Sequence, residues 1–422
     1  MKTVYLDYAA TTYIDAAVFK KIAPYLKRNF GNPSSLYLIG RQAKAAIESA
    51  RASVAKILGV NFQEIIFTGS GTESDNLAVF GVAEAYSNKG KHIIVSKIEH
   101  KAILESARKL EKEGFEITYL GVDSKGLVDL SELKKSLRPD TILVSIMYAN
   151  NEIGTIQPIT EIAKIINEFK KEKKFSSSKP KRKRSPAKRG VSELREENFF
   201  SNYPFFHTDA CQAAGALPLN IKKLGVDLLT INGSKIYGPK GVGCLYKSKD
   251  IKLEPLIVGG GQENNLRAGT ENVALIVGFG EALKLAEKLR LNENRRLKKL
   301  RDYLIRKILK TIPDSRLNGD PTKRLPNNIN VSFKGVEGES LVLMLDKQGV
   351  FASTGSACTS NNLDPSHVLL AIGLESELAH GSLRLTLGRK TTKRDLDYVL
   401  KILPETVHKL REISSMTLNH KK

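Results

Sequence analysis

A glycine-rich turn, an aspartate and a lysine each follow a predicted strand, and their side chains are of types that bind anions and carry amine chemistry. The stretch Ile65–Ser74 reads as a strand, a turn of small residues at Thr68–Gly71, and the start of a helix. Small residues let a backbone approach an anion, and the free N–H groups of a first helical turn point at it. An ordinary capped helix start has the same features, so the turn alone leaves both interpretations open.

Two further side chains are expected at the same edge of the sheet. Asp209 ends one predicted strand, and Lys235 follows the next, within Asn232–Gly241. Taken singly, the aspartate could cap a helix and the lysine could lie on the surface. Together, an amine, an anion cradle and a carboxylate at neighbouring strand ends suit pyridoxal phosphate. The lysine would bind it covalently, the helix start would take the phosphate, and Asp209 would keep the ring nitrogen protonated.

One cysteine lies in a polar segment of small residues, Ser353–Asn362. Buried structural cysteines usually lie in apolar runs, so Cys358 is predicted to be an exposed, reactive thiol. Cys211 and Cys244 lie in or beside predicted strands and are interpreted as packing residues. With only three cysteines in 422 residues, a disulfide framework is not expected, and a reducing cytoplasm is the predicted location.

The elements that must position these residues follow an alternating pattern over the first 250 residues. Helical periodicity at Arg41–Leu58, Glu73–Tyr86 and Lys101–Glu113 separates apolar, β-rich runs. Such alternation predicts an α/β fold with a mainly parallel seven-stranded sheet and helices on both faces, where ligands collect at the carboxyl ends of the strands. The predicted strands are Glu64–Phe67, His92–Ser96, Phe115–Leu120, Thr141–Tyr148, Phe205–Asp209, Asp227–Asn232 and Gly241–Tyr246.

The pattern changes from about Thr270, where a long helix to about Lys310 precedes short strands at Asn328–Phe333 and Ser382–Leu387. Further helices are predicted at Ser340–Gln348, Pro365–Ile372 and Lys393–Ile413, which gives a smaller α+β domain. The predicted organisation is a docking segment over 1–14, a large domain over 15–265 and a small domain over 266–422 that carries the cysteine segment.

Composition and charge narrow the classes of protein. Hydrophobic residues make up 41% and charged residues 27%, which is typical of a globular chain. No apolar run is long enough to span a bilayer, and no secretory signal is visible. The net charge is +22, but Lys170–Gly190 holds eleven Lys/Arg and one Glu. That stretch accounts for +10 of the net charge, so a basic nucleic-acid-binding module is supported by little else.

The residues 171–203 are predicted to be a basic, disordered insertion in the large domain. The stretch contains three serines followed by a Lys/Arg run, and no apolar period is visible before Phe199. A passive loop, a nucleic-acid contact and a nuclear-localisation pattern all remain open interpretations.

These residues, with others along almost the whole chain, resemble the cysteine desulfurases of the NifS/IscS type. These enzymes belong to the class V branch of fold-type-I pyridoxal-phosphate enzymes. The segment around Cys358 is similar to the group that includes IscS rather than the SufS-like group. The resemblance is carried by Tyr5–Thr12, Gly31–Ser35, Thr72–Asn76, Glu99–Lys101, Asn150–Gly154, Lys235–Gly241, Arg267–Thr270 and Gly355–Ser360.

The resemblance implies roles at the matching positions. Lys235 would carry the cofactor, His100 would stack on its ring, and Cys358 would take the substrate sulfur as a persulfide. Arg384 would clamp the substrate carboxylate, helped by Asn150. The remaining implied cofactor contacts are the ring nitrogen for Asp209, the ring hydroxyl side for Asn150 and Gln212, and the phosphate for Gly71, Thr72, Asn232 and Ser234, with Thr270 reaching the phosphate of the neighbouring subunit.

The resemblance also implies partners. These are L-cysteine, a second copy of the chain in a homodimer, and a sulfur-acceptor protein such as an iron–sulfur scaffold or a tRNA-thiolation enzyme. No intrinsic metal is expected, although Cys358 could transiently ligate an iron–sulfur cluster on a scaffold. A selenocysteine lyase, or another class V enzyme, is the alternative reading. One departure is clear: the family usually has Ser-Gly-His-Lys where this chain has Asn232-Gly233-Ser234-Lys235.

Overall fold

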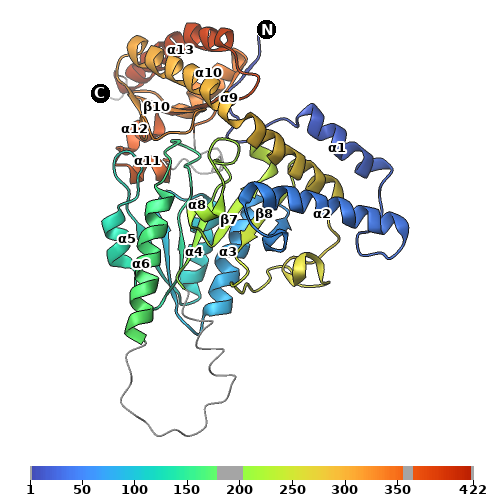
Figure 1. Ribbon diagram of the computed structural model, residues 1–422. Helices are drawn as coiled ribbons and strands as arrows, with labels where there is room; N and C mark the ends of the chain where they lie inside the picture. Colours follow the sequence, from blue (N-terminus) through green and yellow to red (C-terminus); the bar gives the residue numbers. More distant parts are fainter. Residues whose placement is uncertain (1, 178–202, 355–364, 420–422) are drawn as a thin grey trace.

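The computed structural model describes residues 2–177, 203–354 and 365–419, and its larger body is built on a seven-stranded sheet (Figure 1). The strand order is β2-β8-β7-β6-β5-β3-β4, and only β8 within this sheet is antiparallel to its neighbours. The mainly parallel sheet predicted from the sequence is therefore confirmed. The strands are β2 (Ile65–Thr68), β3 (His92–Ser96), β4 (Glu116–Leu120), β5 (Thr141–Ser145), β6 (Phe205–Asp209), β7 (Leu228–Asn232) and β8 (Gly243–Lys247).

Helices cover both faces of this sheet because successive strand residues point to opposite sides. Ile66 packs with helices α3 and α4 on one face, while Ile65 and Phe67 pack with α2 and α9 on the other. The helices of the larger body are α1 (Ala16–Lys27), α2 (Leu38–Leu58), α3 (Gly71–Tyr86), α4 (Lys101–Lys112), α5 (Leu130–Ser136), α6 (Ile159–Ser177) and α8 (Ile221–Leu224).

A smaller body lies beyond the sheet, at the top of Figure 1. Its antiparallel sheet has the order β12-β10-β9, formed by β9 (Ser315–Leu317), β10 (Asn328–Phe333) and β12 (Ser382–Thr386). Helices α10 (Gly338–Lys347) and α13 (Lys393–Asn419) share its apolar core. The short helices α11 (His367–Ala371) and α12 (Ser376–His380) pack against Ile98, Met147 and Ile153 of the larger body.

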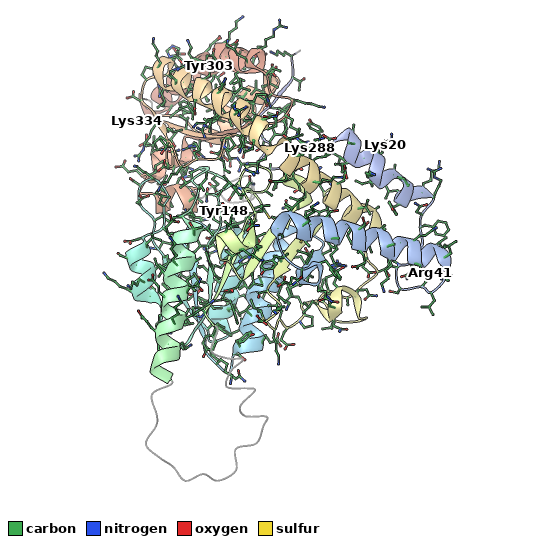
Figure 2. All side chains as sticks on the ribbon, in the orientation of Figure 1. Lys20, Arg41, Tyr148, Lys288, Tyr303 and Lys334 are labelled. Carbon is green, nitrogen blue, oxygen red and sulfur yellow. The ribbon has the colours of Figure 1, made fainter. Side chains whose placement is uncertain are left out.

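One long helix and the N-terminal segment join the two bodies. Helix α9 (Val273–Thr311) contacts α1 and α2 along its first part and α13, β9 and β10 along its last part. Lys288 and Tyr303 mark these two parts in Figure 2. Strand β1 (Val4–Tyr5) pairs with β11 (Val350–Phe351) of the smaller body, and Thr12 is hydrogen-bonded to Ser234 of the larger one.

The N-terminal segment therefore contacts both bodies, where the sequence predicted docking on one of them. The hydrogen bonds of β1 could not be foreseen, because a two-residue strand has no periodicity. The domain bounds at 14/15 and 265/266 stay predictions.

The predicted insertion begins differently from expectation. Helix α6 continues to Ser177, so residues 171–177 are helical rather than part of a disordered loop. Lys173 donates a hydrogen bond to the Pro139 carbonyl at 2.7 Å and lies over the Tyr203 ring. These contacts extend the helix past the point where its apolar pattern ends. The remainder of the insertion, 178–202, lies outside the described residues.

Within the described ranges, no helix combines the length and the apolar character needed to cross a bilayer.

Candidate active site

The turn predicted to hold phosphate lies between β2 and α3. Ser70 is the N-cap of α3, and its side chain accepts a hydrogen bond from Glu73 N at 3.0 Å. Gly71 begins the helix and is buried. A Cβ at this position would lie 2.8 Å from Cys211 Sγ and 3.0 Å from Asn232 Nδ2. Only glycine fits here, and the close approach brings the turn against Asn232, as the sequence predicted.

Asp209 ends β6 and lies beside this turn. It is 8% exposed, and its Oδ1 accepts a hydrogen bond from Cys211 N at 2.8 Å. Asp75 of α3 is buried nearby, where burial and the charge of Asp209 raise its pKa well above the usual range. Burial lowers the pKa of His207, on the same strand, to about 3, so this histidine is neutral.

The N-terminal segment meets the Lys235 turn directly. Lys235 Nζ donates to the Ala10 carbonyl. Thr12 Oγ1 donates to the Ser234 carbonyl at 2.9 Å and accepts from Tyr237 N at 2.9 Å. Ser234 itself lies 3.5 Å from the Asn232 amide oxygen. The segment around residues 10–12 thus fixes the turn that presents the lysine.

The same segment reaches Arg384 on β12 of the smaller body. Asp7 Oδ1 accepts from Arg384 Nη2 at 2.8 Å, and the Asn151 carbonyl accepts from Nη1 at 3.1 Å. Arg384 is 3% exposed, and its Nε has no hydrogen-bond partner among the described residues. A buried guanidinium with an unused N–H can still bind a carboxylate. Asp7 and Ala10 therefore connect Arg384 of one body to Lys235 of the other.

Asn150 shapes the turn that contacts Arg384. Its Oδ1 accepts from Glu152 N and Ile153 N at 2.8 and 2.9 Å, and its Nδ2 donates to the Ile98 carbonyl at 2.9 Å. The amide is buried and already has partners on both atoms. In this structure Asn150 therefore supports the turn, and its predicted contact with the ring hydroxyl stays a prediction.

Glu152, in the same turn, holds the start of α11. Ser366 donates to the Glu152 carboxylate, and His367 Nε2 lies 3.0 Å from the Glu99 carbonyl. Burial raises the pKa of Glu152, while the nearby His367 and Arg384 act in the opposite direction. On the N-terminal side of residues 355–364, Arg384 N donates to the Ser353 carbonyl at 2.6 Å. Both described flanks of 355–364 are thus held close to the site.

His100 is the N-cap of α4. Its Nδ1 accepts a hydrogen bond from Ala102 N at 3.1 Å, so a neutral ring carries its proton on Nε2. This contact is the capping role that a histidine at a helix start would have in isolation. It also fixes the ring plane next to the carboxyl end of β3, which is compatible with the predicted stacking.

Glu99, beside His100, is fully buried. Its Oε1 accepts from Ser96 and from Met147 N, while Oε2 has no partner within the described ranges. Burial raises the pKa of Glu99 to about 8. The carboxyl group is therefore protonated in the folded chain at neutral pH.

The proton on Glu99 predicts how stability depends on pH. Between pH 4.5 and about 8 the folded chain binds a proton that the unfolded chain releases, so the free energy of unfolding falls as pH rises, by at most about 1.4 kcal/mol per pH unit. Glu99→Gln should flatten this slope and raise Tm relative to the parent more at pH 8 than at pH 5. Thermal melts over pH 5–8.5 measure it, with the exposed Glu105→Gln as control. Equal slopes in Glu99→Gln and the parent would contradict the prediction.

The remaining predicted site residues have fewer contacts with the residues described above. Gln212 Nε2 donates to the Ala9 carbonyl at 3.0 Å, whereas Thr72 and Thr270 are exposed. Gln212 and Lys235 also line a solvent-open pocket between the two bodies, together with Tyr8 and Arg389. Cys358 lies outside the described residues, so its predicted role is untested. Cys211 and Cys244 are buried, as expected of packing residues.

Several residues of the site carry no signal that sequence reasoning used. Asp7, Glu99, Glu152 and Ser366 act through contacts between segments far apart in the chain. Asp7, Glu99 and Glu152 belong to motifs noted above, but nothing in their spacing reveals their distant partners. Tyr148, which follows β5, marks the sheet edge that faces the smaller body in Figure 2.

The donor set fits pyridoxal phosphate. The described residues contain a glycine cradle that any Cβ would fill, a buried carboxylate next to it, and a buried arginine with an unused Nε. An anionic aromatic cofactor with an amine-reactive group matches this combination.

The chain is similar to known proteins over nearly its whole length. The family model described as Aminotransferase class-V matches residues 4–173 and 199–399. The "Cysteine desulfurase IscS" of Dictyoglomus turgidum is 54% identical over 98% of this chain and 96% of its own length, and that of Methanosarcina thermophila is 50% identical over 99% and 95%. A solved "NIFS-LIKE PROTEIN" superposes with a TM-score of 0.83 at 35% identity, covering 96% of this chain and 100% of its own.

Proposed function

The chain belongs to the aminotransferase class-V family and is a pyridoxal-phosphate-dependent cysteine desulfurase of the NifS/IscS type, and we propose that Lys235 and Cys358 are its two reactive residues. The substrate is L-cysteine, and the sulfur passes to an acceptor protein. The observation that carries the assignment of Lys235 is the N-terminal segment, which links Lys235 to Arg384 through Ala10 and Asp7.

The cofactor would be held by groups that follow four strands of the larger body, namely β2, β3, β6 and β7. Gly71, Thr72, Asn232 and Ser234 would bind the phosphate, Asp209 would pair with the ring nitrogen, His100 would stack on the ring, and Gln212 would bind the ring hydroxyl side. When bound, pyridoxal phosphate supplies an electron-accepting ring that stabilises negative charge at the substrate Cα. Asp209 would keep that ring protonated through its carboxylate, and His207 on the same strand is neutral, so it adds no positive charge beside Asp209.

The residues divide the reaction between them. Arg384 binds the carboxylate of L-cysteine and orients its Cα–H toward Lys235. Lys235 Nζ removes this proton and later returns it to Cα, while the carbon that becomes the alanine methyl takes a second proton from solvent. The Cys358 thiolate attacks the substrate sulfur, so an S–S bond forms while the C–S bond breaks and its electron pair stays with carbon. The products are L-alanine and a persulfide on Cys358.

The flanks of the cysteine segment support this role for Cys358. Ser353 is bonded to the backbone of Arg384, and Ser366 to the side chain of Glu152. The first attachment is to Arg384, which is proposed to bind the substrate, and the second is to the turn after β5 whose Asn151 carbonyl contacts Arg384. The chain between them can therefore start and end close to the bound substrate.

Replacing Arg384 tests the substrate site. Arg384→Lys should raise KM for L-cysteine about 10–100-fold with a smaller change in kcat, because a bidentate, charge-assisted contact is lost while a positive charge remains. Steady-state alanine release measures both constants. Arg389→Lys is the matched control, since Arg389 also binds a carboxylate of the N-terminal region, that of Asp15, at 3.0 Å. An unchanged KM in Arg384→Lys, or an equal rise in the control, would contradict the assignment.

We also propose a homodimer in which Thr270 reaches the partner's phosphate. Exposed apolar side chains support it, since Phe30, Leu36 and Val258 are 76%, 88% and 80% exposed. The loops that carry them are neighbours, because Pro33 and Gly261 line one surface pocket. Leu36→Asp is expected to shift the sedimentation coefficient from dimer to monomer and to weaken cofactor binding. A monomeric parent chain would overturn the proposal.

A cytoplasmic location is proposed from the low cysteine content, with Cys211 and Cys244 buried as free thiols. The acceptor is proposed to be an iron–sulfur scaffold or a tRNA-thiolation enzyme. Delivery of sulfur from the persulfide to each purified acceptor would decide between them.

A further inference from the structure

The carboxylate of Glu73 lies in the first turn of α3, immediately beside the proposed phosphate site. Its Oε2 accepts a hydrogen bond from Gly69 N at 2.8 Å, and its Oε1 accepts from Arg267 Nε at 3.0 Å. Gly71 and Thr72, which are proposed to bind phosphate, lie between Gly69 and Glu73 in the chain. The carboxylate thus closes the turn on one side and binds a distant arginine on the other.

A carboxylate at this place has two opposing effects. It is favourable for the empty helix start, because negative charge there interacts well with the helix dipole. It is unfavourable once a phosphate binds the same helix start, since two like charges then share one turn of backbone N–H groups. The side chains of Glu73 and Arg267 are 21% and 28% exposed, so water screens this repulsion only in part.

Arg267 is held in place by a second, deeper ion pair. Glu263, in the same loop, accepts from Arg51 Nη1 and Nη2 of α2, both at 2.7 Å, and from Phe67 N of β2 at 2.9 Å. The Glu263 and Arg51 side chains are 2% and 8% exposed. Glu263 therefore fixes the loop to β2, the strand that leads into the phosphate turn. Because this loop also carries Arg267, the fixed loop holds Arg267 next to Glu73.

We propose that Arg267 is a positioning residue that neutralises Glu73 and thereby sets the affinity of the α3 turn for the cofactor phosphate without touching it. The inference rests on the proposed function. It explains why the turn can use a glutamate to order Gly69 without losing its affinity for an anion. Arg267 lies three residues before Thr270. The loop that neutralises Glu73 in one subunit is therefore the loop proposed to reach the phosphate site of the partner subunit.

The test is a double-mutant cycle on cofactor binding to the apoprotein, followed by visible absorbance. Arg267→Gln leaves Glu73 unneutralised and should weaken binding of pyridoxal 5'-phosphate about tenfold at low salt, with a smaller loss at 0.5 M salt. Binding of pyridoxal, which lacks the phosphate, should change less than about twofold. The double variant Glu73→Gln/Arg267→Gln should return to within about threefold of the parent.

Arg138→Gln is the matched control. Arg138 pairs with Asp140 at 2.9 Å, its side chain is 34% exposed, and it lies at the amino end of β5, away from the turn. The Arg138→Gln variant should bind pyridoxal 5'-phosphate as tightly as the parent does. If Arg267→Gln does not fold, Glu73→Gln decides alone, because it must bind the cofactor at least as tightly as the parent.

Three results would overturn the inference: unchanged binding in Arg267→Gln, an equal loss for pyridoxal, or a double variant as weak as the single one. Failure of the proposed function looks different. In that case the parent itself would not prefer pyridoxal 5'-phosphate over pyridoxal.

Discussion

Lys235→Ala is expected to lower the rate of alanine release from L-cysteine by about 10³-fold or more. The lysine has two tasks in the proposed mechanism: it binds the cofactor covalently and it moves the Cα proton. Loss of a positioned general base alone typically costs 10²–10⁴-fold. The variant should still bind the cofactor through the phosphate turn and Asp209, because the hydrogen bond from Lys235 to Ala10 is one of several contacts that hold the N-terminal segment.

Two measurements check this prediction. Borohydride treatment of the cofactor-loaded parent, followed by peptide mass mapping, should place the adduct on Lys235. Single-turnover alanine release should then show the rate loss in Lys235→Ala, with Lys240→Ala, on the exposed side of the same turn, as control. An adduct on another lysine in cofactor-saturated protein would refute the assignment.

Cys358→Ala is expected to abolish persulfide formation while leaving the earlier steps intact. The thiol acts on the substrate sulfur only after L-cysteine has bound and lost its Cα proton. The variant should therefore bind the cofactor like the parent and keep the absorbance change on adding L-cysteine. Sulfide release in the presence of a reductant should fall at least about 100-fold, because the variant lacks the nucleophile of a covalent step.

Cys211→Ala and Cys244→Ala are the matched controls. Both thiols are buried, and burial raises the pKa of each above its usual value, so neither forms a thiolate readily. Each control should retain the activity. If Cys211→Ala loses sulfur release while Cys358→Ala turns over like the parent, the nucleophile has been misassigned. Selenocysteine can be tested as a second substrate. If Cys358→Ala releases alanine from selenocysteine but not from L-cysteine, the selenocysteine lyase alternative is favoured.

Much of the fold follows from local patterns in the sequence. The alternation of β-rich runs with helical periods predicted the mainly parallel sheet, and His92–Ser96 and Phe205–Asp209 have the bounds that were predicted. Asn328–Phe333 likewise has the predicted bounds, and the strand predicted at Ser382–Leu387 ends one residue earlier, at Thr386. Such predictions succeed because burial on both faces of a strand requires continuous apolar residues, which can be read along the chain.

The chemical types at the strand ends could also be predicted. Parallel strands end at one edge, so Asp209, the turn at Gly71 and the residues after β7 had to lie near one another. The structure brings Gly71 against Asn232 and Cys211, as that rule requires. Where the chain departs from local rules, prediction was wrong: α6 runs to Ser177 because Lys173 is held by Pro139 and Tyr203, which are distant in sequence.

The sequence by itself therefore determined the sheet, the strand-end chemistry and the family to which the chain belongs. Only the tertiary structure decided that the N-terminal segment joins Arg384 to Lys235, that Glu152 holds the flank of the cysteine segment, and that Arg267 neutralises Glu73. The physical reason is the range of the interactions. Periodicity reports whether a residue is buried, which is a local property of a strand or helix. A hydrogen bond or an ion pair depends on the position of a second residue, and that position exists only once the two bodies have packed together.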